Sequence, residues 1–200
     1  GPFDNYSFRL ANVLLGNAPE IAALEITLQG PTLQFSAPTR IAVAGAEIPL
    51  SLDGEVLPMH TPVDIAAGQT LVMGRIQAGA RAYLAVAGGI DCPEYLGSRA
   101  TFTLGQFGGH NGRALRTGDV LALGNAPATA AQSAAQAPRP EIASQWTLRV
   151  IYGPHGAPDF FTDTDIQQFF STDWEVHYNS SRTGVRLIGP KPQWARQSGG

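Results

Sequence analysis

The sequence contains only one cysteine, Cys92, and this scarcity limits what the protein can be. A single thiol cannot form an intrachain disulfide, and it cannot supply a cysteine-rich metal cluster. The composition fits a reducing compartment. We therefore expect a cytoplasmic protein that holds its fold without disulfides.

Charged residues are also few, at 14% of the chain, and the formal net charge is only −3. The 13 Lys and Arg residues are scattered, whereas a protein that tracks phosphates needs clustered cations to displace counterions. No apolar run approaches the roughly 20 residues that span a bilayer, and no N-terminal signal is present. We expect neither a nucleic acid nor a membrane as a partner.

Motifs for hydrolysis or metal binding are absent as well. None of the four histidines accompanies a G-x-S-x-G elbow, and no H-x-x-x-H or C-x-x-C spacing occurs. The glycine-rich stretch 105–113 lacks the Gly-Lys-Ser/Thr ending of a phosphate loop, so a hairpin with closely approaching backbones is the favoured interpretation. We expect no metal.

Glycine and proline are abundant, with 23 and 15 residues, and they separate short runs of alternating apolar residues. This pattern predicts many short strands and a mainly β fold, in a closed barrel or a sandwich. Phe8, Ala11 and Leu15 have helical spacing, and Gly16 is placed to end that helix. Strands are predicted at residues 24–28, 40–44, 70–75, 81–87, 100–104 and 119–123.

The composition changes at residues 124–145, which are almost all Ala, Pro, Gln and Ser. Such a stretch cannot bury enough apolar surface to offset the entropy of ordering it. We therefore predict a first subdomain at 1–123, an Ala/Pro-rich linker at 124–145 and a second unit at 146–200. The second unit is expected to contain strands at 147–152, 175–178 and 185–188, and a helix at 163–170 with Thr162 or Asp163 as its cap.

The densest group of polar residues is the stretch 177–196. It contains Asn179, two serines, three arginines and Lys191, and it has no acidic side chain. Cations without a local counter-charge favour an anionic or oxygen-rich ligand. A solvated surface segment explains the same composition equally well, so both interpretations stay open.

Several long motifs resemble a known family. PFDNYSFRLANVLLGN, LEITLQGPTLQF, LAVAGGIDCPEYLGSRATFTLGQFGGHNGR and TGDVL are similar to the first half of the carboxyltransferase domain of biotin-dependent urea carboxylases and urea amidolyases. The stretch STDWEVHYNSSRTGVRLIGPKPQWAR resembles the urea carboxylase branch. Two departures are Phe3, where the family usually has Met, and Ser181, where Asp or Asn is often found.

The resemblance implies cyclophilin-like β-barrel subdomains with short helices, of which residues 146–200 are the truncated start of the second. It implies transfer of a carboxyl group from carboxybiotin to urea, giving allophanate. Arg182 and Lys191 are the catalytic candidates, and Asn179, Ser181 and Arg196 are the substrate-binding candidates. Biotin is expected on a carrier domain outside this chain, and ATP is expected to be used by a separate biotin carboxylase domain.

The partners implied are therefore the biotin carboxylase and biotin carrier domains, the second half of the carboxyltransferase and a small urea-like substrate. The fragment alone is expected to be inactive. Three alternatives stay open within the same resemblance: a 5-oxoprolinase subunit, a guanidine carboxylase, and a non-enzymatic module of the kind that antagonises a sporulation kinase inhibitor.

Overall fold

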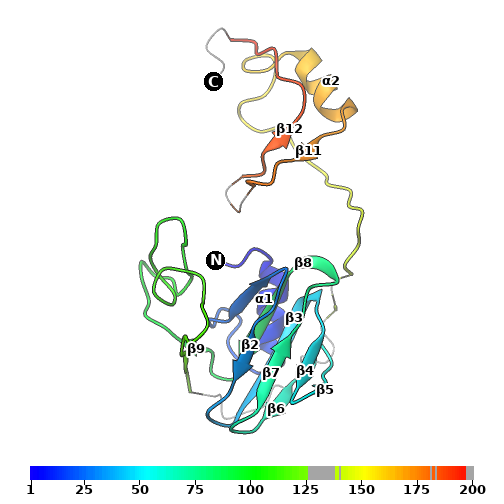
Figure 1. Cartoon of the computed structure of the whole chain (residues 1–200). Coiled ribbons are helices and arrows are strands. Elements are labelled where there is room, and N and C mark those ends of the chain that lie inside the picture. The colour runs from blue at the N-terminus through cyan, green and yellow to red at the C-terminus, as the bar shows by residue number, and fades with distance from the viewer. Residues whose placement is uncertain (126–137, 140, 181, 183, 197–200) are drawn as a thin grey trace. The chain divides into compact units, whose positions relative to one another are not determined.

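The computed structural model describes residues 1–125, 138, 139, 141–180, 182 and 184–196. The chain divides into two compact units, Gly1–Gln145 and Trp146–Gly200. The described residues form short antiparallel strands and two helices (Figure 1), which confirms the prediction of a mainly β fold with short helices. Closure of the sheets into a cyclophilin-like barrel stays a prediction.

Two four-stranded antiparallel sheets make up the body of the first unit. One has the strand order β1-β8-β3-β6, and the other has the order β2-β7-β4-β5. The first sheet consists of β1 (Leu24–Thr27), β8 (Ala78–Val86), β3 (Thr39–Glu47) and β6 (Val63–Ile65). The second consists of β2 (Thr32–Gln34), β7 (Thr70–Met73), β4 (Leu50–Leu52) and β5 (Glu55–Val56), and a small pair joins β9 (Ile90–Asp91) to β10 (Ala122–Leu123).

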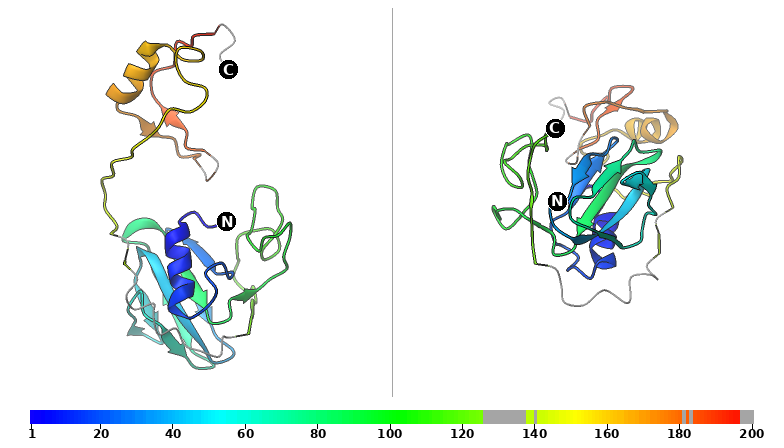
Figure 2. Two further views of the ribbon diagram at one scale, coloured as in Figure 1. Left: turned by 180° about the vertical axis from the view of Figure 1, so that it is seen from behind. Right: turned by 60° about the horizontal axis from the view of Figure 1, so that its bottom comes forward.

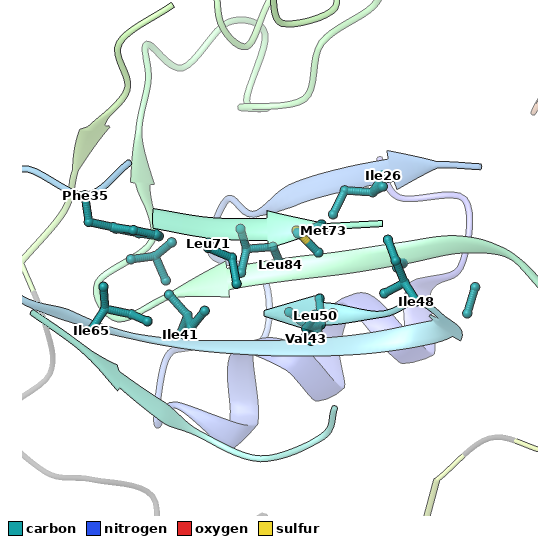
Figure 3. Close-up of a cluster of buried hydrophobic side chains, with 13 residues drawn as sticks. Ile26, Phe35, Ile41, Val43, Ile48, Leu50, Ile65, Leu71, Met73 and Leu84 are labelled. Atoms are coloured by element: carbon teal, nitrogen blue, oxygen red, sulfur yellow. The ribbon is translucent and has the colours of Figure 1, made fainter. Parts of the chain in front are cut away.

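Side chains alternate between the two faces of β3 and β8, as the period of a strand requires. Ile41 and Val43 of β3 join Leu84 of β8 in a cluster that also takes in Leu71 of the second sheet (Figure 3). The core of the unit therefore lies between the two sheets. The intervening residues face the other way and are small, apart from Tyr83.

Helix α1 (Asn5–Leu14) covers that other face (Figure 2). Leu10, Ala11 and Leu14 are buried against Ala42 and Ala44, whose small side chains form a flat surface for the helix. The Asp4 side chain caps the helix by accepting a hydrogen bond from the Ser7 amide at 3.1 Å. Helix α1 thus makes a third layer over the first sheet.

Tyr83 is the largest fully buried side chain of the first unit, and it ties the N-terminal segment to the sheet. Its hydroxyl accepts a hydrogen bond from the Asp4 amide at 2.7 Å and donates one to Glu25 Oε2 at 3.0 Å. Burial, aided by the nearby Glu25 and Asp4 carboxylates, raises the pKa of Tyr83 above its usual value of about 10.

We predict that Tyr83→Phe destabilises the protein at pH 7 by about 1–3 kcal/mol, since the half-buried backbone amide of Asp4 loses its acceptor.

The raised pKa of Tyr83 also predicts a pH dependence, because the native state keeps its phenolic proton when the unfolded state has lost it. The stability from this group is therefore complete below about pH 10 and is lost as the pH rises further. Between pH 7 and 11, the thermal unfolding midpoint should fall less steeply in Tyr83→Phe than in the unaltered protein. Tyr152→Phe, at an exposed tyrosine, is the control, and parallel slopes in all three proteins would contradict the prediction.

The second unit is small and, in its described part, has almost no buried residues. It contains helix α2 (Asp163–Ser171) and a hairpin of β11 (Glu175–Val176) and β12 (Leu187–Ile188). Thr162 caps α2, which confirms one of the two predicted caps. In the described part of this unit only Asp165 is buried, whereas the described part of the first unit buries a large apolar core.

Two predicted strands do not form. Residues 100–104 instead belong to a tight hairpin in which Phe102 bridges Phe107, and Gln106 in its turn has φ of 58°. Residues 147–152 pair with no other strand in the part of the chain that the structure describes, and Leu148 and Ile151 are 82% and 95% exposed. An isolated strand gains no ladder hydrogen bonds, so the alternating pattern alone does not produce a sheet here.

The predicted linker falls mostly outside the described residues, because 126–137 and 140 are not described. Its described end contacts the first unit: the Tyr6 hydroxyl donates a hydrogen bond to the Pro138 carbonyl, and a Cβ on Gly79 would lie 3.1 Å from Cγ2 of Ile142. The boundaries 1–123 and 124–145 stay predictions.

Candidate functional site

The hairpin of β11 and β12 carries two of the predicted site residues, Asn179 and Arg182, in the loop that joins its strands. We call this loop the tip. Glu175 pairs with Ile188 and Val176 with Leu187, and the His177 amide donates to the Arg186 carbonyl at 2.9 Å. The residues between His177 and Arg186 therefore form the connecting loop. Asn179 and Arg182 belong to it.

Ser180 organises this loop. Its hydroxyl donates to the His177 carbonyl at 2.7 Å and accepts a hydrogen bond from the Arg186 amide at 3.1 Å. The backbone amide of Asn179 donates a hydrogen bond to His177 Nδ1 at 3.0 Å, so this ring nitrogen acts as an acceptor. These bonds fix the backbone on both sides of the cationic tip.

The predicted side chains of the tip lie on the surface of the unit. Asn179 and Arg182 are exposed, and Ser181 lies outside the described residues. A polar surface loop of this kind is accessible to a small substrate or to a neighbouring domain. The roles assigned to these three residues stay predictions.

Lys191 lies at the other end of the hairpin, beyond the last residue of β12. A Cβ on Gly189 would lie 2.3 Å from Cε3 of Trp174, so only glycine lets the backbone approach this ring. Trp174 is itself held by a 2.8 Å hydrogen bond from Nε1 to the Phe169 carbonyl. The exposed side chain of Lys191 thus follows a tightly packed turn.

Arg196 is held by the chain around Phe160. Its Nε donates to the Asp159 carbonyl at 2.8 Å, and its guanidinium carbon lies 3.9 Å from the centre of the Phe160 ring. This cation–π contact orients the planar group. The structure therefore separates the predicted residues into a tip, with Asn179 and Arg182, and a base, with Lys191 and Arg196.

Asp165 is a residue of this region that the sequence analysis did not single out. Its Oδ2 accepts two hydrogen bonds from Thr162, one from the backbone amide at 2.9 Å and one from the hydroxyl at 2.8 Å. Its Oδ1 accepts a hydrogen bond from the backbone amide of Gln193 at 2.7 Å. These donors, led by the Gln193 amide, lower the pKa of Asp165. The T-x-x-D pattern from Thr162 to Asp165 is the sequence signal for a capping box.

The glycine-rich stretch of the first unit has the close backbone approach that was predicted for it. A Cβ on Gly108, which has φ of 73°, would lie 2.4 Å from the Ala100 carbonyl oxygen. Arg113 holds the following turn with two hydrogen bonds to Asp119, at 2.7 and 2.8 Å, and this contact lowers the pKa of Asp119. Close backbone packing thus accounts for Gly108.

Two observations bear on other functions. Among the residues that the structure describes, no three or more His, Cys, Asp or Glu side chains gather where they would hold a metal ion. Neither helix in the described part of the chain has the length and apolar character needed to cross a membrane.

Comparison with known proteins adds independent information. The family model described as carboxyltransferase domain, subdomain A and B, matches residues 1–199. The urea amidolyase of Saccharomyces cerevisiae is 50% identical over 207 residues, which cover 100% of this chain and 11% of that protein. A 5-oxoprolinase subunit of Escherichia coli is 34% identical, over 94% of this chain and 59% of its own length.

The fold agrees with a solved structure. The crystal structure of the K. lactis urea amidolyase superposes with a TM-score of 0.89 at 47% identity, and the match covers 98% of this chain and 12% of that one. The chain thus spans about a tenth of the length of the urea amidolyases that it matches. It belongs to the carboxyltransferase family defined by subdomains A and B.

Proposed function

We propose that this chain forms part of the carboxyltransferase of a biotin-dependent urea carboxylase. The observation that carries the proposal is the 50% identity, over the whole chain, to a urea amidolyase. The lower identity of 34% to a 5-oxoprolinase subunit makes 5-oxoproline the second candidate substrate.

The donors of the hairpin fit a carboxyl group and a urea molecule. Arg182 and Lys191 carry only hydrogen-bond donors and positive charge, which match a carboxylate. Asn179 and Ser181 supply both donors and acceptors, as urea requires. Biotin on a carrier domain outside this chain would supply the carboxyl group, and Arg182 and Lys191 would bind that group. A urea nitrogen held by Asn179 and Ser181 would take up the carboxyl group and give one proton to the biotin in exchange, so that allophanate forms.

We assign separate roles to the two cations, because they lie at opposite ends of the hairpin. Arg182, in the same loop as Asn179, binds the carboxyl group beside the urea. Lys191, on the packed segment beyond β12, stabilises the negative charge that develops during transfer. Arg196, fixed on Phe160, forms one wall of the substrate site.

The rest of the reaction requires partners outside this chain. A biotin carboxylase domain would use ATP to carboxylate biotin, the carrier domain would deliver it, and the second half of the carboxyltransferase would complete the site. This division of labour is consistent with the length of the urea amidolyases that the chain matches. The fragment alone is therefore expected to have no turnover.

The substrate is tested by measuring ATP turnover of the full-length enzyme with urea, guanidine or 5-oxoproline. We expect turnover to depend on urea, and we expect the product to be allophanate. Turnover that depends on guanidine or on 5-oxoproline instead would contradict the assignment and would select the corresponding alternative. A full-length protein whose ATP turnover depends on none of the three would point to a non-enzymatic module.

A further inference from the structure

Lys191 lies on a short segment that is fixed at both of its ends. On one side, Ile188 is paired with Glu175, and the backbone of Gly189 packs against the Trp174 ring. On the other side, the backbone amide of Gln193 donates a hydrogen bond to the Asp165 carboxylate at 2.7 Å. Only the sequence Pro190-Lys191-Pro192 separates the two anchors.

The prolines make this short connection stiff. Each proline ring fixes its own φ near about −65°, and a residue that precedes proline is restricted to extended conformations. Lys191 follows one proline and precedes the other, so its backbone has little freedom. Its position is therefore determined by the two anchors.

Asp165 is the anchor that joins this segment to helix α2. Asp165 and Gln193 are 28 residues apart in the sequence, and Asp165 is the buried residue of the described second unit, with 6% exposure. The chain beyond Gln193 is held against the residues that precede α2, because the Ala195 amide donates to the Phe160 carbonyl at 2.9 Å and Arg196 donates to Asp159. Of these contacts, the bond to Asp165 is the nearest to Lys191 along the chain.

We infer that Asp165 is a positioning residue for the transfer reaction, acting through Lys191. Its carboxylate fixes the backbone at Gln193, and the proline-flanked connection passes that constraint to the backbone of Lys191, from which the ammonium group extends. In the described part of the chain this ammonium has no ion-pair partner, which leaves its charge available for a ligand. The inference depends on the proposed function, because it assumes that Lys191 acts in carboxyl transfer.

The structural half of the inference is tested by hydrogen exchange on the full-length enzyme. Asp165→Ala should increase exchange of the amides between Gly189 and Arg196, because the acceptor for Gln193 is lost. Asp163→Ala is the matched control: it removes a carboxylate from the same first turn of α2, but Asp163 is exposed. Unchanged exchange in Asp165→Ala would overturn the positioning role, whatever the substrate is.

The functional half is tested by urea-dependent turnover. We expect Asp165→Ala to lower kcat by about 10- to 100-fold, since a misplacement of about 1 Å can cost 100-fold, and to leave carboxylation of free biotin unchanged. Asp165→Asn keeps an oxygen that can accept from Gln193 and should retain more activity. It serves as the test if Asp165→Ala does not fold. Thr162→Val, which removes the cap hydroxyl but keeps the bond to Gln193, should have a smaller effect.

A double-mutant cycle separates positioning from general stability. If Asp165 acts through Lys191, adding Asp165→Ala to Lys191→Ala should lower kcat by less than about twofold further, because coupled residues are not additive. Effects that multiply would overturn the inference. If Lys191→Ala alone leaves turnover unchanged, the proposed function of Lys191 fails, and the exchange experiment still reports on Asp165 separately.

Discussion

Lys191→Ala and Arg182→Ala should each lower urea-dependent turnover of the full-length enzyme by about 100- to 1,000-fold, the loss seen when one preorganised donor is removed from developing negative charge. The packing of Gly189 against Trp174 predicts that Lys191 is preorganised, so its loss should appear mainly in kcat. Arg182, which belongs to the same loop as Asn179, should affect kcat and KM together. Steady-state kinetics with urea and coupled detection of ADP measure both constants.

The controls separate a loss of carboxyl transfer from a general defect. Carboxylation of free biotin, which we assign to a biotin carboxylase domain outside this chain, should be unchanged in both variants. Arg149→Ala removes an exposed guanidinium from the same unit, at a position outside the hairpin sequence, and should have no effect on turnover. Full urea-dependent activity in Lys191→Ala or in Arg182→Ala would remove that residue from the site.

The central strands could be predicted because their environment imposes a regular pattern. In β3 and β8 one face contacts the second sheet and the other contacts α1, so residues 41–44 and 82–86 are all apolar and the size of the side chains alternates, as with Ile41 and Ala42. Among the strands that were not predicted, β4, β5 and β6 have two or three residues and lie close to Pro49, Pro58 and Pro62. Too few residues remain between those prolines to reveal a period.

The candidate site was only partly predictable. The cationic composition of residues 177–196 is visible in the sequence, but its division into a tip and a base depends on the register of β11 with β12. The bond from Gln193 to Asp165 joins residues that are 28 positions apart, and no local pattern encodes such a contact. The predicted cap at Thr162 or Asp163 located the start of α2 but did not indicate that Asp165 also accepts a hydrogen bond from the backbone of Gln193.

The two units should differ sharply when each is produced alone. Residues 1–145 bury a large apolar cluster between two sheets and a second cluster under α1, so we expect a cooperative thermal transition, in the range of about 45 to 65 °C that is usual for such domains. Residues 146–200 expose Ile151, Tyr178 and Val185 by 95%, 93% and 63%, and their described part buries no apolar side chain.

A chain of that size without a core cannot offset the entropy of ordering its backbone. We therefore expect no cooperative transition in residues 146–200, measured by near-ultraviolet circular dichroism of Trp146, Trp174 and Trp194 during heating. Trp174→Phe serves as the matched control for the signal, because this tryptophan packs against Gly189. A sharp transition in the isolated second unit would mean that the hairpin and α2 are stable by themselves. The exposed apolar side chains would then not need cover from other parts of the carboxyltransferase.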